Sequence, residues 1–303
     1  MKVGLVDIDG HGFPNFALMK ISAWHKRNGD TVEWYDPLFS RCERIYASKV
    51  FTFTKPYSYF PNDCEVIKGG TGYDFALKLP EVIEHSAPDY SIYPQYSYAI
   101  GFLSRGCIRN CPWCVVPRKE GAIRPVDDIE RIYRESGRRH VVLMDNNFLA
   151  CPAEFVREQL EKAQKLKLLL DFNQALDARL VTDENAPLLV KTKWRDMNGN
   201  NSYIRFSCDT AGVINAVKSA IKLIRKAGFF GYFFIYFLAK EVKETLNRIM
   251  EILNFDPRVN PFVMPWRNLD GDGEIADDNL KRLARWCNMA SIRKSCRFED
   301  YKG

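Results

Sequence analysis

The stretch at residues 98–114, YAIGFLSRGCIRNCPWC, joins an apolar run to three closely spaced cysteines. Residues 98–103 have the length and composition of a buried strand. Cys107, Cys111 and Cys114 follow at C-x3-C-x2-C spacing. A short loop with this spacing can place three thiolates around one face of a cubane iron–sulfur cluster, which a fourth cysteine would close. Because three cysteines leave one iron open to a small molecule, the stretch predicts chemistry rather than a structural metal.

The composition is typical of a packed globular protein. The chain has 303 residues, of which 46% are hydrophobic and 27% charged, enough for one large and one small domain. It contains no apolar run of about 18 residues, so we expect no membrane span. A net charge of +6 is compatible with an anionic substrate or nucleic acid. The basic residues are scattered, however, and indicate no nucleic-acid partner.

The cysteines and the N-terminus together favour a cytoplasmic location. The apolar run at the N-terminus is short and is followed directly by acidic residues, a pattern that predicts a strand rather than a signal peptide. Nine cysteines without an export signal argue against a disulfide framework and for a reducing compartment. The six cysteines outside the opening stretch are dispersed, and each is expected to be a small buried hydrophobe: Cys42, Cys64, Cys151, Cys208, Cys287 and Cys296.

Residues 1–95 alternate apolar runs with turn signals. Strands alternating with helices predict parallel βαβ units, so we expect a small Rossmann-like domain here. Asn15 is placed to cap the helix that follows the first strand. His11, on the loop after that strand, is either a ligand contact or exposed surface. The expected strands are residues 2–8, 31–35, 46–54, 65–68 and 88–93.

The opening stretch begins a second series of alternating strands and helices. Six β/α units predict a partial (β/α)6 barrel of the TIM type over residues 96–270, so the fold class is α/β. A last helix is expected at residues 278–291, within a C-terminal helix and tail over residues 271–303. The six strands are expected at residues 98–103, 140–144, 168–172, 203–207, 231–238 and 261–267.

Polar residues follow several of these strands. In parallel barrels, ligands gather at the carboxyl ends of the strands, where the cysteine loop also falls. The alternative for any single residue is that Asn, Asp and Ser only mark turns. The residues are Asp145 and Asn146, Asn173 and Gln174, and Ser207 and Asp209.

The cysteine spacing, with Trp113 before the third cysteine, resembles the signature of the radical S-adenosylmethionine (radical SAM) superfamily. The resemblance implies that Cys107, Cys111 and Cys114 hold a [4Fe–4S] cluster whose fourth iron chelates S-adenosylmethionine. It further implies reductive cleavage of S-adenosylmethionine to a 5′-deoxyadenosyl radical, which abstracts hydrogen from a substrate. The electron would come from a reductant such as flavodoxin or ferredoxin. The substrate stays unnamed, and no catalytic residue is assigned beyond the cluster.

The resemblance also assigns cofactor contacts. Trp113 matches the aromatic position near the adenine. Asp145 and Asn146 stand where the superfamily has a Gly-Gly-Glu-like segment for the methionine amine, although no glycine pair is present here. The residues after the third and fourth strands match positions that reach the ribose or carboxylate: Asn173, Gln174, Ser207 and Asp209. Arg179 or Arg205 could pair with the carboxylate, and a surface or interstrand ion pair is the alternative for either.

The front part resembles the cobalamin-binding-like domain of many superfamily members. Asp9-Gly10-His11 matches the start of the Asp-x-His-x-x-Gly motif, but Pro14 stands at the glycine position. Cobalamin is therefore possible but not favoured as a cofactor. A cobalamin-dependent radical SAM methyltransferase is one alternative function. A non-catalytic iron–sulfur or zinc module is the other, although zinc usually takes four protein ligands.

Overall fold

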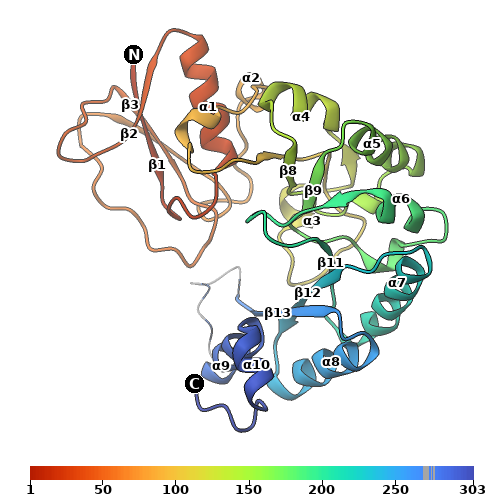
Figure 1. Cartoon of the computed structure of the whole chain (residues 1–303). Helices are drawn as coiled ribbons and strands as arrows, with labels where there is room; N and C mark the ends of the chain where they lie inside the picture. Colours follow the sequence, from red (N-terminus) through yellow and green to blue (C-terminus); the bar gives the residue numbers. More distant parts are fainter. Residues whose placement is uncertain (269–272, 274, 276) are drawn as a thin grey trace.

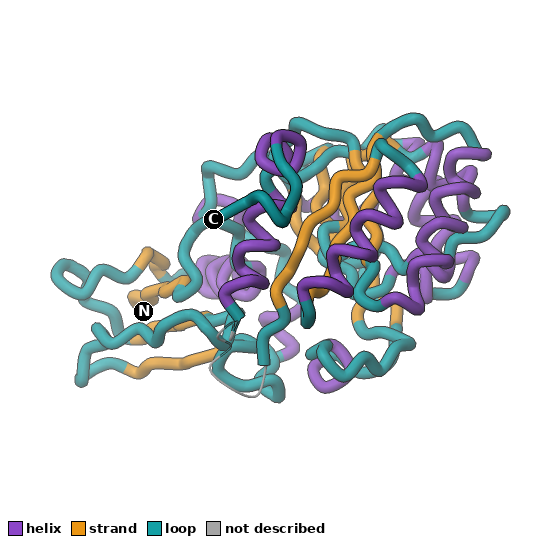
Figure 2. The backbone as a smooth tube through the Cα atoms, turned by 90° about the horizontal axis from the view of Figure 1, so that it is seen from below, coloured by secondary structure: helices purple, strands orange, loops and turns teal. Residues whose placement is uncertain are grey.

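The computed structural model describes residues 1–268, 273, 275 and 277–303. A front sheet lies at one end of the molecule, and a larger arc of strands and helices forms the rest (Figure 1). Figure 2 shows this arrangement from below, with helices flanking the strands of the larger part. Within the described ranges, no helix is long and apolar enough to cross a membrane.

The front sheet has four parallel strands in the order β2-β1-β3-β4, all within the fully described residues 1–95. Asn15 caps the first helix, as predicted, by accepting a hydrogen bond from the Leu18 N–H group at 3.2 Å. No helix connects β2 to β3 or β3 to β4 in this described part. Parallel pairing is confirmed, and the Rossmann-like assignment stays a prediction. The elements are β1 (Lys2–Asp7), α1 (Phe16–Arg27), β2 (Thr31–Trp34), β3 (Arg44–Ser48) and β4 (Glu65–Gly69).

The strand predicted at residues 88–93 is wrong. Asp89 accepts a hydrogen bond from the Ser91 N–H group at 2.9 Å, which closes a 3-10 turn, η1 (Tyr90–Ile92), instead of leaving the chain extended. Tyr93 is buried and donates its hydroxyl hydrogen to Asp7 Oδ2 at 2.6 Å. After the short helix α2 (Glu81–Glu84), this segment is therefore a packed connection between the front sheet and the larger part.

In the larger part, six parallel strands follow one another in chain order among the described residues. A parallel bridge between Leu176 and Phe206 joins the first three to the last three. The two-residue strand β10 (Lys193–Trp194), which pairs with β9, was too short for the sequence to indicate. The six strands are β5 (Ala99–Gly101), β8 (His140–Leu143), β9 (Leu169–Phe172), β11 (Tyr203–Ser207), β12 (Tyr232–Ala239) and β13 (Val259–Pro265).

Helices cover the outer side of this arc (Figure 1). Alternate strand residues such as Phe206 and Phe233 pack in the main core with helix residues such as Ile221. Alternation divides the aromatic residues of β12 between the two faces of the sheet. Phe234 and Tyr236 lie half-buried on the opposite face of the sheet. The covering helices are α4 (Ile129–Ser136), α5 (Ala153–Lys165), α6 (Ala186–Lys191), α7 (Ile214–Lys226) and α8 (Val242–Phe255).

The C-terminal segment forms two helices, α9 (Asp278–Asn288) and α10 (Ala290–Ser295), where the sequence predicted one. Met289 has extended backbone angles and separates them. Asn288 fixes α9 to β13 through two hydrogen bonds with the Val263 backbone, at 2.7 and 3.0 Å. The predicted domain boundary at residues 270 and 271 lies outside the described residues.

Candidate metal centre

The cysteine loop projects from the carboxyl end of β5. Two short strands, β6 (Ser104–Arg105) and β7 (Arg124–Pro125), pair antiparallel and close its base. Gly106 has φ +84°, and a Cβ atom there would lie 2.1 Å from the Ala122 carbonyl oxygen. Only glycine fits this close approach of the two chain segments. The loop also contains the one-turn helix α3 (Val116–Lys119) after the third cysteine.

Three consecutive residues after β8 hold the first half of this loop. Asp145 is 1% exposed, and its carboxylate accepts from the backbone N–H groups of Leu103 and Ser104 at 3.0 and 2.6 Å. Asn146 Oδ1 accepts from the Gly106 N–H group at 3.0 Å. Both side chains were predicted as cofactor contacts. In the structure their oxygens accept hydrogen bonds from backbone N–H groups at the start of the loop. Burial raises the pKa of Asp145 to about 6, against the lowering effect of its hydrogen bonds from Ser104 and Leu103.

Asn147, the third residue, was not singled out from the sequence. Its Nδ2 atom lies 3.3 Å from Cys107 Sγ and 3.4 Å from Asp177 Oδ2. The side chain is 3% exposed, and its Oδ1 atom is buried with no hydrogen-bond partner in the part of the chain that the structure describes. The only sequence signal was its place in the Asp-Asn-Asn run at a strand's carboxyl end.

Two arginines face the buried carboxylate of Asp177 beside the loop. Arg179 contacts it at 2.7 and 3.0 Å, and Arg109 Nε lies 3.0 Å from its Oδ2 atom. Burial alone would raise the pKa of Asp177, but the two arginines lower it overall. The backbone N–H group of Arg109 also lies 3.3 Å from Cys107 Sγ. Both arginines therefore bring positive charge close to the cysteine loop, and Arg109 and Asp177 were missed from the sequence.

The three cysteines of the loop are half-buried and free. Burial raises the pKa values of Cys111 and Cys114, and neighbouring thiols raise them further. Among the described residues, no three His, Cys, Asp or Glu side chains are grouped closely enough to hold a metal ion. The assignment of the cysteines as metal ligands is thus still a prediction.

A cavity of about 190 Å³ borders the second half of the loop. Lys240 Nζ lies 4.9 Å from the centre of the Trp113 ring and 5.3 Å from that of the Trp266 ring, so it bridges two walls of this region. The predicted adenine contact, Trp113, therefore has an aromatic counterpart at the end of β13. The cavity is lined by Asn110, Cys111, Pro112, Trp113, Cys114, Pro117, Arg118, Trp266, Arg267 and Asn268.

The remaining predicted contacts lie at the carboxyl ends of β9 and β11. Asn173 is half-buried, and its carbonyl oxygen accepts from the Tyr236 hydroxyl at 2.9 Å. Gln174 is exposed, and Ser207 is half-buried. Asp209 accepts from the Leu238 N–H group at 3.3 Å, and burial raises the pKa of its carboxyl group. Of these four residues, only Asp209 is a charge that contributes to the raised pKa values of Cys111 and Cys114.

Arg205 does not face a free ligand position. Its guanidinium group contacts both carboxylate oxygens of Asp171 on the neighbouring strand, at 2.5 and 2.8 Å. Both side chains are buried, at 6% and 1% exposure. This is the interstrand ion pair that the sequence left as the alternative. Arg179 is 36% exposed, and its guanidinium group is paired with Asp177.

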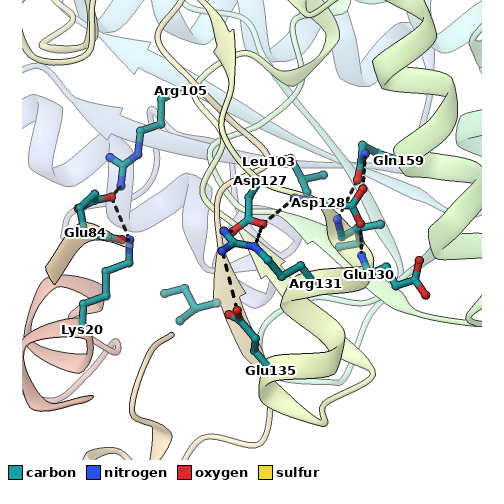
Figure 3. A network of polar contacts seen from close by, with 12 residues as sticks. Lys20, Glu84, Leu103, Arg105, Asp127, Asp128, Glu130, Arg131, Glu135 and Gln159 are labelled. Carbon is teal, nitrogen blue, oxygen red and sulfur yellow. Dashed lines mark hydrogen bonds and ion pairs between the residues drawn. The ribbon is translucent and has the colours of Figure 1, made fainter. Parts of the chain in front are cut away.

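The front part reaches the cysteine loop through a polar network (Figure 3). Glu84 accepts from Lys20 at 2.9 Å and from Arg105 at 3.0 Å. Arg105, which directly precedes Gly106, also contacts Glu120 at 3.0 Å. The residue that begins the loop is therefore held from two sides, by the front part and by the end of the loop itself.

His11, which the sequence gave as either a ligand contact or exposed surface, is exposed on the loop after β1. The His11 ring lies 4.2 Å from the Trp34 ring, and the Tyr96 hydroxyl donates to the His11 carbonyl oxygen. Asp9 accepts from Phe51 N–H at 3.3 Å and from the Thr54 hydroxyl at 2.6 Å. Hydrogen bonds from Phe51 and Thr54 thus fix the loop after β1, and its His11 ring contacts Trp34.

No protein family matches this chain, and no curated protein does. Among solved structures, the chain is similar to the crystal structure of methylornithine synthase (PylB), with 12% sequence identity and a TM-score of 0.42. The similarity covers 63% of this chain and 61% of that chain.

Proposed function

We propose that this chain is a radical SAM enzyme whose six parallel strands form the partial barrel of that superfamily. The observation that carries the proposal is the position of the C-x3-C-x2-C loop at the carboxyl end of β5, tied there by Asp145, Asn146 and Asn147 from the end of β8. Ligand sites of parallel α/β folds gather at this edge. The proposed division is a front domain at residues 1–95, a barrel at 96–270 and a C-terminal segment at 271–303.

The chemistry of the donor set fits a [4Fe–4S] cluster. Cys107, Cys111 and Cys114 supply three thiols on one short loop, and soft thiolates are the usual ligands of iron–sulfur clusters. Cys107 Sγ already receives N–H groups from Arg109 and Asn147, both at 3.3 Å. Such donors to cluster sulfurs help set the reduction potential. The buried Asn147 Oδ1 atom, which has no hydrogen-bond partner among the described residues, is a further sign of a ligand at this place.

When bound, the reduced cluster and S-adenosylmethionine supply an electron and a cleavable sulfonium bond, and so a 5′-deoxyadenosyl radical for hydrogen abstraction. The chain's own residues hold and shield this site. Arg179 at the rim offers a partner for a carboxylate, and Trp113 and Trp266 offer aromatic surfaces beside Cys111. Asp145 and Asn146 fix the loop backbone, so that the cysteines keep one arrangement.

The proposal also includes an electron donor, a location and further cofactor contacts. The electron donor would be flavodoxin or ferredoxin, and the location cytoplasmic. Asn173, Gln174, Ser207 and Asp209 remain proposed cofactor contacts at the same edge of the strands. Cobalamin is not favoured, because Pro14 stands at the glycine position of the motif.

Anaerobic reconstitution with iron and sulfide tests the proposal. A brown protein with about four irons per chain is expected, which releases 5′-deoxyadenosine from S-adenosylmethionine after reduction with dithionite. A colourless protein that holds one zinc ion and leaves S-adenosylmethionine intact would overturn the proposal and support the non-catalytic alternative.

A further inference from the structure

The strand β12 presents two faces that differ in burial. Phe233, Ile235 and Phe237 are each 0% exposed and pack in the main core under the outer helices (Figure 1). The alternate residues Phe234 and Tyr236 lie on the opposite, inner face of the sheet, where they are only half-buried. The described residues therefore cover the inner aromatic side chains less completely than those of the core.

Four aromatic rings form one continuous surface on this inner face. The Phe234 ring lies at its centre, 5.4 Å from the Tyr203 ring and 5.1 Å from the Tyr236 ring. The Phe262 ring lies 5.6 Å from Phe234 and 5.8 Å from Tyr236. Separations of about 4.5–7 Å are those of interacting aromatic pairs. We call these four residues, from three neighbouring strands, the aromatic platform.

The platform borders a pair of opposite charges that already satisfy each other. Arg205 lies 4.6 Å from the centre of the Phe234 ring, and its guanidinium group contacts both carboxylate oxygens of Asp171. Asp171 Oδ2 also accepts from the Met197 N–H group at 2.9 Å. A ligand carboxylate would have to displace Asp171, and a ligand cation would meet the guanidinium group. This neighbourhood favours an uncharged ligand.

The inner face continues from the platform to the proposed metal centre. Lys240 follows Tyr236 by four residues, which places both on the same side of the chain, at a separation of about 13 Å for a rise of about 3.3 Å per residue. Lys240 Nζ lies over the rings of Trp113 and Trp266, which line the cavity beside the cysteine loop. The platform is thus reached from that cavity along one face of β12.

We propose that the aromatic platform binds the substrate of this enzyme through a planar, uncharged ring, either aromatic or heteroaromatic. That the bound ring belongs to the substrate rests on the proposed function, whereas ring binding rests on the platform alone. Tyr236 and Phe262 offer a ring face and a ring edge to such a ligand. The Tyr236 hydroxyl donates to the Asn173 carbonyl oxygen at 2.9 Å, so the ring of Tyr236 is held in place before a ligand arrives.

Three probes of similar size test the class of ligand. 2-Naphthol is planar and uncharged at neutral pH. Decahydro-2-naphthol keeps the carbon frame and the hydroxyl group without the planar ring, and 2-naphthoate keeps the ring but carries a negative charge. The Kd of each is measured with the reconstituted protein by isothermal titration calorimetry. We expect 2-naphthol to bind tightest, with the other two weaker by about fivefold or more.

Single substitutions test whether the ring binds on the platform. Phe262→Leu and Tyr236→Leu each remove a ring but keep an apolar side chain, and Tyr236→Phe keeps the ring. Phe255→Leu is the control, because Phe255 is 44% exposed at the end of the outer helix α8.

We expect the Kd of 2-naphthol to rise roughly 3- to 10-fold in the two platform leucine variants. It should change less than about twofold in Tyr236→Phe and Phe255→Leu. Decahydro-2-naphthol should bind all variants alike, whereas a general loss of structure would weaken every probe. Urea unfolding identifies variants that do not fold, and the comparison needs only one of the two leucine variants to fold.

Decahydro-2-naphthol or 2-naphthoate binding as tightly as 2-naphthol would overturn the inference, as would 2-naphthol binding that neither leucine variant weakens. If such a wild-type protein still cleaves S-adenosylmethionine, the proposed function stands and only the platform assignment fails. Conversely, a wild-type protein that binds 2-naphthol on the platform but never cleaves S-adenosylmethionine overturns the proposed function, and with it the assignment of the bound ring as a substrate.

Discussion

Arg105 and Glu84 lie 3.0 Å apart and join the front part of the chain to the residue that precedes Gly106. Glu84 also pairs with Lys20, which is only 10% exposed. Loss of a partner for a largely buried charge costs more than loss of a surface pair. The contact therefore ties the stability of the front part to the position of the cysteine loop.

Glu84→Gln should lower the free energy of unfolding by about 1–2 kcal/mol, because it leaves Lys20 with a weaker partner. Glu130→Gln is the control, since its partner Arg134 is 74% exposed, and its cost should stay within about 0.5 kcal/mol. Urea unfolding of the two variants makes the comparison. Equal losses would show that the Glu84 pair behaves as an ordinary surface contact.

Asp145 should make stability depend on pH in an unusual direction. Burial raises the pKa of its folded-state carboxyl group to about 6, above an ordinary unfolded value of about 3.9. The folded state then binds the proton more tightly, so the free energy of unfolding falls as pH rises from about 4 to 6, by about 3 kcal/mol at most. Asp145→Asn should lose this contribution. Parallel urea titrations from pH 4.5 to 7.5 measure it, and identical pH profiles for both proteins would refute it.

Gly106 should tolerate no side chain. Alanine there combines a strained φ of +84° with a contact of 2.1 Å to the Ala122 carbonyl oxygen. Gly121 has a similar φ of +72°, but open space surrounds the position of its Cβ. Gly121→Ala should cost only about 1–2 kcal/mol from backbone strain, whereas Gly106→Ala should distort the loop and lose bound iron after reconstitution. Full iron content in Gly106→Ala would contradict the close approach of the two segments.

Much of this fold could be predicted because the information is local. Apolar runs predicted all six strands of the larger part, since each carries its own pattern of burial. The short strand β10 was not predicted, because two residues carry no periodicity. The turn at Tyr90–Ile92 was not predicted either, because a single Asp89 hydrogen bond decides it. Met289 likewise breaks a helix that composition alone would continue.

The candidate site was only partly predictable, because its contacts depend on register between distant segments. Asp145 and Asn146 were placed at the correct strand end, yet the sequence does not tell whether such side chains face a ligand or the loop. Asn147 and Asp177 lie 30 residues apart, and their contact exists only once β8 and β9 are side by side. The pairing of Arg205 with Asp171 depends on strand pairing in the same way.

The central claim is that Cys107, Cys111 and Cys114 hold a cluster that cleaves S-adenosylmethionine. Its most direct test is the yield of 5′-deoxyadenosine from reduced, reconstituted Cys111→Ala, beside wild type and Cys296→Ala, whose half-buried thiol lies outside the loop. We predict cleavage by wild type and by Cys296→Ala, and loss of both iron and cleavage in Cys111→Ala. Retained cleavage in Cys111→Ala, or none in an iron-loaded wild type, would contradict the account.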